Sequence, residues 1–198
     1  MKIVAENIGK KYGKRWVFRN INCEVQSGTK MSIVGRNGAG KSTLLQMLSG
    51  FLTPTEGNIV LKSSTVVSPE NIAQHISLIG PYCEIIEEMN LREFLFFHSK
   101  YKKPRLSFAE MAEKASLPLE KTIKDFSTGM KQRAALITAF YYYNEAVFFD
   151  EPTSNLDEDG FFWWREEVTK MSKVTILIAS NKKSEVEICE EAIDLKIK

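Results

Sequence analysis

The sequence has few cysteines and no long apolar run. Cys23, Cys83 and Cys189 stand far apart in the 198 residues, without a CxxC pair. Thiols this sparse are typical of a reduced, cytosolic protein rather than of a disulfide framework. The opening MKIVAENIGKKYGKRW has no apolar signal segment, and nowhere do about 18 apolar residues follow one another. We therefore expect neither a secretory leader nor a membrane span.

Neither sign of charge dominates. The 27 basic and 25 acidic residues leave a net charge of +2, so we expect no nucleic-acid partner. A hydrophobic content of 43% with 11 Gly and 6 Pro is that of a globular protein and excludes disordered and collagen-like classes. The length predicts one domain over residues 1–198.

Short apolar runs alternate with helical patterns along most of the chain. The β-type runs are Ile3–Ile8, Val17–Val25, Lys30–Val34, Asn58–Leu61, Ala146–Phe149 and Val174–Ala179, and the chain closes with 188–197. The helical patterns cover Lys41–Leu48, Thr128–Tyr143 and Gly160–Met171. Strands that alternate with helices predict an α/β fold with a mainly parallel sheet.

The middle of the chain has a different character. Leu91–Phe97 and Phe108–Ala115 have apolar residues at helical spacing, which predicts a helical subdomain at about 90–143 inserted into a core of about 1–89 and 144–198. Between the two helices lie Lys100, Lys102, Lys103 and Arg105, for which we expect a solvated loop rather than a binding patch.

A phosphate-binding loop is predicted between the run Lys30–Val34 and the helix that follows it. Residues 35–42, GRNGAGKS, satisfy G-x-x-x-x-G-K-[ST] between a strand and a helix. The glycines let backbone N–H groups turn toward phosphates, Lys41 neutralises phosphate oxygens, and Ser42 offers a hydroxyl to Mg²⁺. A glycine turn that merely caps a core helix is the alternative, and the flanking strand and helix disfavour it.

Two adjacent acids end the apolar strand at 146–149. Burying two carboxylates side by side is costly unless a metal or a proton transfer compensates for it. Asp150 therefore suits Mg²⁺, and Glu151 suits the base that polarises an attacking water. An acidic surface turn is the alternative.

Several further motifs resemble those of the ATP-binding subunits of ABC transporters. FSTGMKQR at 126–133 is similar to the LSGGQ signature, PTSNLD at 152–157 to the linker and D-loop, and GFLTPTEG at 50–57 to the exit from the P-loop helix. Tyr12 occupies the place of the aromatic residue that stacks on adenine. The resemblance covers essentially the whole chain, and together its motifs are highly specific.

The resemblance implies how such a chain would work. The expected fold is a P-loop NTPase core with a small antiparallel β subdomain at the N-terminus and an inserted helical subdomain. Phosphates would lie against Asn37, Gly38, Ala39, Gly40, Lys41, Ser42 and Thr43. Ser127 and Gly129 would bind the γ-phosphate of ATP held by the opposite subunit, so that two copies, or one copy and a related subunit, enclose ATP head to tail. Separate integral membrane subunits would place the chain on the inner face of the membrane.

The sequence departs from the family pattern at two positions. Asn181 stands where the family usually has a histidine that contacts the γ-phosphate, and an amide cannot carry imidazolium charge. Pro81 stands where a glutamine usually touches Mg²⁺, with Tyr82 and Glu84 close by.

Three functions remain open at this point. The first is a Mg²⁺-dependent, transport-coupled ATPase, with Glu151 as the base and with Lys41 and Asn181 assisting it. The second is a soluble ABC-type module of translation or DNA repair, and the third is a nucleotide-gated subunit with little hydrolysis.

Overall fold

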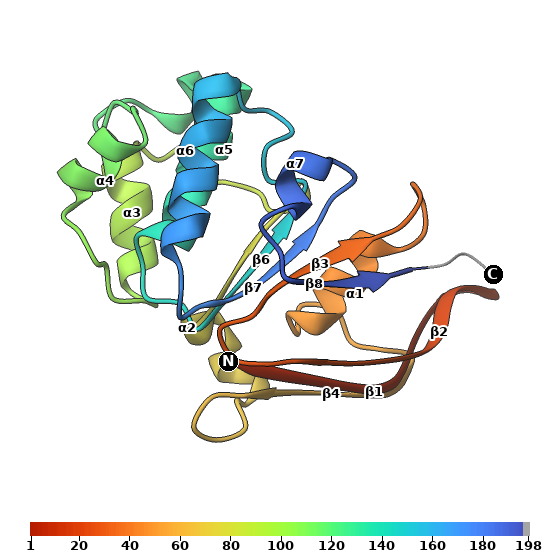
Figure 1. The fold of residues 1–198 in the computed structure, drawn as a ribbon. Helices are drawn as coiled ribbons and strands as arrows, with labels where there is room; N and C mark the ends of the chain where they lie inside the picture. Colours follow the sequence, from red (N-terminus) through yellow and green to blue (C-terminus); the bar gives the residue numbers. More distant parts are fainter. Residues whose placement is uncertain (196–198) are drawn as a thin grey trace.

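Two β-sheets of different kinds organise the chain. In the computed structural model, which describes residues 1–195, three strands near the N-terminus form an antiparallel sheet (Figure 1). They are β1 (Lys2–Tyr12), β2 (Arg15–Val25) and β4 (Glu56–Lys62), in the order β2-β1-β4. The small antiparallel subdomain expected at the N-terminus is therefore present.

The larger sheet has five strands, all parallel. It is ordered β5-β6-β7-β3-β8. The strands are β3 (Lys30–Val34), β5 (Ile76–Ile79), β6 (Ala146–Asp150), β7 (Thr175–Ala179) and β8 (Glu191–Asp194). Strands β6 and β7 are buried on both faces, which explains why they are continuous apolar runs. The predicted α/β class with a mainly parallel sheet is confirmed.

Each face of this sheet packs against a different layer. Val147 and Phe149 belong to an apolar cluster with the helices of the middle of the chain, whereas Phe148 belongs to a second cluster with α1 (Lys41–Leu48) and β1. Helix α1 is thereby enclosed between the two sheets (Figure 1).

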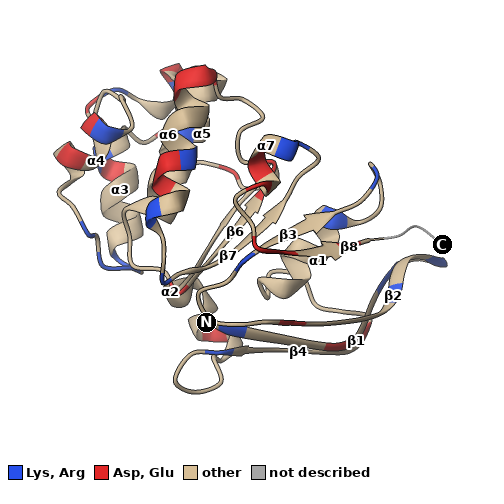
Figure 2. Cartoon of the chain, in the orientation of Figure 1, with Lys and Arg blue, Asp and Glu red and all other residues tan. Residues whose placement is uncertain are grey.

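The other helices lie mainly on the far side of the large sheet (Figure 1). They are α3 (Leu91–Ser99), α4 (Phe108–Lys114), α5 (Thr128–Phe140) and α6 (Glu158–Lys170), with one-turn helices α2 (Ile72–His75) and α7 (Lys183–Val186) in connections. Asn90 and Ser107 begin α3 and α4 with capping boxes. Acidic and basic residues are interspersed over these helices (Figure 2).

The structure corrects some predicted boundaries. Helix α5 ends at Phe140 rather than at Tyr143, and α6 begins at Glu158 because the Asp157 carboxylate accepts a hydrogen bond from the Gly160 N–H. The closing strand expected over 188–197 is only the four residues of β8, and positions 196–198 lie outside the described residues. Among residues 1–195, no helix has the length and hydropathy to cross a bilayer.

Candidate nucleotide site

The glycine-rich loop connects β3 to α1, as its sequence predicts. Gly38 and Gly40 have φ angles of +79° and +97°, in the left-handed region that favours glycine. The Ala39 N–H donates to the Arg36 carbonyl at 3.1 Å, which closes the turn, and Gly40 is the N-cap of α1. The loop therefore ends at a helix N-terminus, where backbone N–H groups and the helix dipole favour an anion.

Lys41 is folded back into this loop. Its side chain is buried, and its Nζ donates to the carbonyl oxygens of Gly35 at 3.1 Å and Arg36 at 3.3 Å. Both partners are neutral carbonyls, so these hydrogen bonds do not neutralise the ammonium charge. A buried cation at the centre of an amide-lined loop is chemically suited to a phosphate group.

Asp150 ends β6 in a buried position. Burial, more than any other cause, raises the pKa of its carboxyl; the nearby charge of Glu151 also raises it, and the Ser42 hydroxyl lowers it. Its Oδ2 is buried and has no hydrogen-bond partner among residues 1–195. An orphaned carboxylate oxygen beside a hydroxyl is a donor set that suits a hydrated Mg²⁺, so the residues present fit the metal that the sequence predicts.

Glu151 differs from Asp150 in both exposure and backbone. Its side chain is exposed, and its φ of +47° places a non-glycine residue in the left-handed region. Its N–H donates to the Ala179 carbonyl at 2.9 Å, so the strained residue is fixed to the end of β7. Strain of this kind gathers at functional sites, where the surrounding structure holds it in place.

Asn181 follows β7 and joins the same region. Its side-chain amide donates a hydrogen bond to the Asn37 side chain in the glycine-rich loop. At the second departure from the family pattern, Pro81 is exposed and the Tyr82 hydroxyl is buried. Burial, followed by the charge of Asp150, raises the pKa of Tyr82 far above its ordinary value, so the hydroxyl stays protonated.

The signature residues lie at a separate cavity of about 470 Å³. Ser127 is the N-cap of α5, and its Oγ accepts from the Met130 N–H at 3.2 Å. Gly129 is required for the close packing here, because a Cβ on it would lie 2.9 Å from the Asn155 carbonyl oxygen. The described residues that line this cavity include none of the glycine-rich loop.

Tyr12 does not line the signature cavity. It is exposed at the hairpin between β1 and β2.

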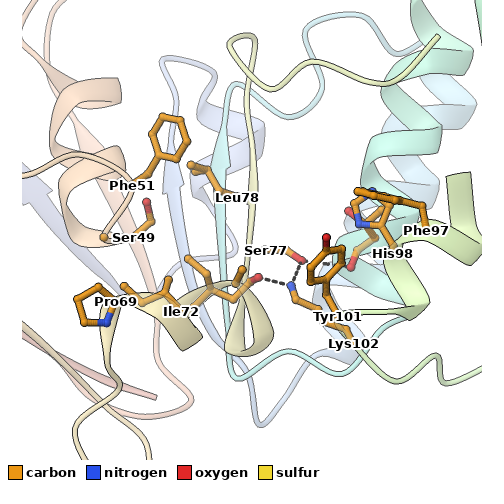
Figure 3. Close-up of a pocket in the computed structure, with 14 residues that line it drawn as sticks. Ser49, Phe51, Pro69, Ile72, Ser77, Leu78, Phe97, His98, Tyr101 and Lys102 are labelled. Atoms are coloured by element: carbon orange, nitrogen blue, oxygen red, sulfur yellow. Dashed lines mark hydrogen bonds between the residues drawn. The ribbon is translucent and has the colours of Figure 1, made fainter. Parts of the chain in front are cut away.

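A second cavity, the aromatic groove, runs between α1 and α2 on one side and α3 on the other (Figure 3). It measures about 510 Å³, and its lining includes Phe51, Ile72, Phe97, His98, Tyr101 and Lys102. Phe51 and Tyr101 are 68% and 55% exposed, so the groove presents apolar surface to its surroundings.

The expectation of a solvated Lys102 is wrong. Its Nζ donates to Ser77 Oγ at 2.9 Å and to the Ile76 carbonyl (Figure 3). It also donates to Asn144 Oδ1 at 2.7 Å. Burial lowers the pKa of Lys102 to about 7. The partners lie on β5 and before β6, so this lysine ties the loop after α3 to the large sheet.

Sequence reasoning also missed Glu185. It lies on α7 with no exposed surface, and its Oε1 accepts from the Thr153 N–H at 3.3 Å and from the Thr153 hydroxyl. A lone glutamate in a charged stretch carries no signal for this role. Tyr82 is visible in the sequence as a neighbour of Pro81, where the family usually has a glutamine, but no motif there indicates a role for it.

Comparison with known proteins identifies the family. The family described as ABC transporter matches residues 18–154. The lantibiotic transport ATP-binding protein SrtF of Streptococcus pyogenes is 32% identical over 194 residues, which cover 92% of this chain and 81% of the relative. The bacitracin transport ATP-binding protein BcrA of Bacillus licheniformis is 32% identical over 195 residues, which cover 93% and 63%.

A solved structure shares the fold. The ATP-binding cassette MJ0796, in a dimeric post-hydrolysis state bound to ADP and Pi, superimposes with a TM-score of 0.85 at 20% identity, over 98% of this chain and 94% of the cassette. The chain belongs to the ABC transporter family, and its fold is that of the family's ATP-binding cassette.

Proposed function

We propose that this chain is a Mg²⁺-dependent ATPase subunit that drives an ABC transporter. The observation that carries the proposal is the placement of the buried Lys41, whose hydrogen bonds go to neutral carbonyls, and the buried Asp150 at the same end of the parallel sheet. Lys41 favours a phosphate, and Asp150 favours a divalent cation. Mg²⁺-ATP contains both of these groups. We assign residues 90–143 to a helical subdomain within a single domain of residues 1–198.

Each part of the nucleotide has a proposed set of residues. Tyr12 stacks on adenine. The phosphates bind to Asn37, Gly38, Ala39, Gly40, Lys41, Ser42 and Thr43. Ser42 and Asp150 hold Mg²⁺, which withdraws charge from the phosphate oxygens.

The exposed Glu151 is the residue that we assign as the base in ATP hydrolysis. In our proposal, its carboxylate accepts a proton from a water that attacks the γ-phosphorus, while the bond from phosphorus to the bridging oxygen of ADP breaks. The Asn181 amide, close to the loop through Asn37, donates a hydrogen bond to a γ-phosphate oxygen.

A second copy of the chain completes the site. The signature cavity and the glycine-rich loop are separate in one chain, so Ser127 and Gly129 bind the γ-phosphate held by the loop of the partner. Each chain offers both surfaces, and a head-to-tail arrangement lets both pairs close around two ATP molecules. The dimeric state of the cassette MJ0796 supports this arrangement.

A membrane subunit is the partner that we assign to the aromatic groove. An apolar surface between two packed layers, rimmed by exposed Phe51 and Tyr101, fits an apolar segment of another protein. Its lysine is already satisfied by three oxygens, so the occupant needs no matching acid. This contact would hold the chain on the inner face of the cell membrane.

Phosphate release from the purified protein with Mg²⁺ and ATP tests the catalytic part. Glu151→Gln should lower the rate by about 100-fold or more, because the amide cannot accept the proton. The same variant should form an ATP-dependent dimer, measured as solution mass. The matched control is Glu190→Gln at another exposed glutamate, which should change neither quantity.

Two results would contradict this proposal. Equal rates for the wild type and Glu151→Gln would remove the assigned role of Glu151. ATP binding without phosphate release by the wild type would make the chain a nucleotide-gated subunit.

Fractionation of the source cells tests the membrane partner. Tyr101→Asp should move the protein from the membrane fraction to the supernatant without weakening ATP binding.

A further inference from the structure

Two buried oxygen atoms without partners lie near one another at the end of β6. The Tyr82 hydroxyl and Asp150 Oδ2 are both buried, and neither has a hydrogen-bond partner within the described part of the chain. A buried polar group without a partner destabilises the fold, because it loses its hydrogen bonds to water and gains none in return. The oxygen of Asp150 has a proposed occupant in Mg²⁺. The polar side chains nearest to the Tyr82 hydroxyl are those of Asp150 and Gln46, and within the described residues neither meets it with hydrogen-bond geometry.

The Tyr82 ring is held in place from two sides. It stacks on Phe51, with ring centroids 6.2 Å apart and an interplanar angle of 25°. On its other side, Gly80 leaves room for it: a Cβ on Gly80 would lie 2.8 Å from Tyr82 Cζ and 3.1 Å from Asp150 Cβ. Because Cζ carries the hydroxyl, this packing keeps the hydroxyl beside Asp150.

The backbone explains why Gly80 brings these side chains together. Strands β5 and β6 are parallel with Ile79 opposite Phe149, so Gly80 follows β5 at the level of Asp150. Tyr82 then turns back over Gly80 toward β6. The residue at the expected glutamine position, Pro81, is exposed and has no polar side chain to offer.

We propose that Tyr82 is a positioning residue of the magnesium site, whose hydroxyl holds a metal-bound water beside Asp150. This inference rests on the proposed function. Protein-bound Mg²⁺ keeps several of its waters, and each needs an oxygen to receive its hydrogen bonds. A neutral phenol oxygen accepts one such bond without adding charge to a site that already has Asp150 and Glu151. One hydrated cation thereby satisfies both orphaned oxygens.

Tyr82→Phe is the test, because it removes only the hydroxyl and keeps the ring on Phe51. The affinity for a non-hydrolysable ATP analogue is measured by calorimetry with Mg²⁺ and with EDTA. The Kd in Mg²⁺ should rise about fivefold, the effect of one lost hydrogen bond, and the Kd in EDTA should stay unchanged. Gly80→Ala should reproduce the loss, since the added methyl group displaces the ring.

Thermal unfolding without nucleotide separates this role from a structural one. The hydroxyl has no partner in the ligand-free fold, so Tyr82→Phe should leave the Tm unchanged or raise it. The matched control is Tyr143→Phe, which removes a hydroxyl from an exposed tyrosine and should alter no Kd.

The outcomes distinguish the two proposals. Wild-type affinity that depends on Mg²⁺, with an equal Kd for Tyr82→Phe, would overturn the role of Tyr82 alone. A lower Tm together with weaker binding in EDTA would also overturn it, in favour of a structural role. A wild-type protein whose affinity ignores Mg²⁺ would overturn the proposed function, and the role of Tyr82 with it.

Discussion

Asn181 and Asn37 join the end of β7 to the glycine-rich loop by a hydrogen bond between their side chains, across 144 residues of sequence. The donor is the amide of Asn181, at the place where the family usually has a histidine. An amide keeps the same charge at every physiological pH, so this contact does not respond to acidification.

Asn181→Ala should lower ATP turnover about tenfold, because one hydrogen-bond donor toward the γ-phosphate is lost. The affinity for ATP should change less than about threefold, since the other groups of the loop remain. Steady-state phosphate release and calorimetry give the two numbers. Asn58→Ala on β4 is the control, and an unchanged turnover in Asn181→Ala would refute the assigned contact.

Gly129→Ala should abolish the ATP-dependent dimer. Its added Cβ would lie 2.9 Å from the Asn155 carbonyl oxygen, which forces the start of α5 away from the loop before α6. Light scattering of the Glu151→Gln protein with ATP, with and without Gly129→Ala, measures the effect. The affinity of the monomer for ATP should persist, because no residue of the glycine-rich loop is among those that line this cavity. A normal dimer would show that this surface does not face ATP of the partner.

Glu185→Ala should lower the free energy of unfolding by about 2 kcal/mol, because the N–H and the hydroxyl of Thr153 lose their buried acceptor. Glu185→Gln should cost less than about 1 kcal/mol, since it keeps one oxygen for Thr153 and its amide takes the place of the unpartnered Oε2. Urea unfolding of both variants measures this difference. Equal losses would mean that charge, rather than hydrogen bonding, is what matters at this position.

His98 should make the protein less stable in acid. Burial first, and then the charge of Lys102, lowers the pKa of His98 to about 4 from an ordinary 6.5. Between these values the unfolded chain binds the proton and the folded chain does not, so the free energy of unfolding rises with pH across this window. The contribution of neutral, buried His98 to the free energy of unfolding is fully present above pH 6.5 and is lost as the pH falls toward 4.

Urea unfolding at several pH values checks this dependence. His98→Gln should lower the slope by up to about 1.4 kcal/mol per pH unit, because the titrating group is gone. Parallel curves for the wild type and His98→Gln would refute the burial of a neutral imidazole.

Local sequence signals predicted the centre of the fold well. The strand Lys30–Val34 and the helix Lys41–Leu48 have the predicted bounds, because a short, mainly apolar run leads directly into the glycine-lysine motif, whose spacing is fixed. The end of α5 was predicted three residues too late, since Tyr141 and Tyr142 are as apolar outside the helix as residues within it.

Long-range packing explains the features that the sequence did not reveal. Lys102 looks like one basic residue among several, and its partners lie 25 to 42 residues away. Glu185 and Thr153 are 32 residues apart. No local periodicity encodes such pairs, because they depend on how the strands are ordered in the sheet.

Strand β6 is packed on both faces, Phe149 against the helices and Phe148 against α1 and β1. These contacts on both faces hold β6 in place. Asp150, at the end of β6, is therefore held by packing on both sides of the large sheet.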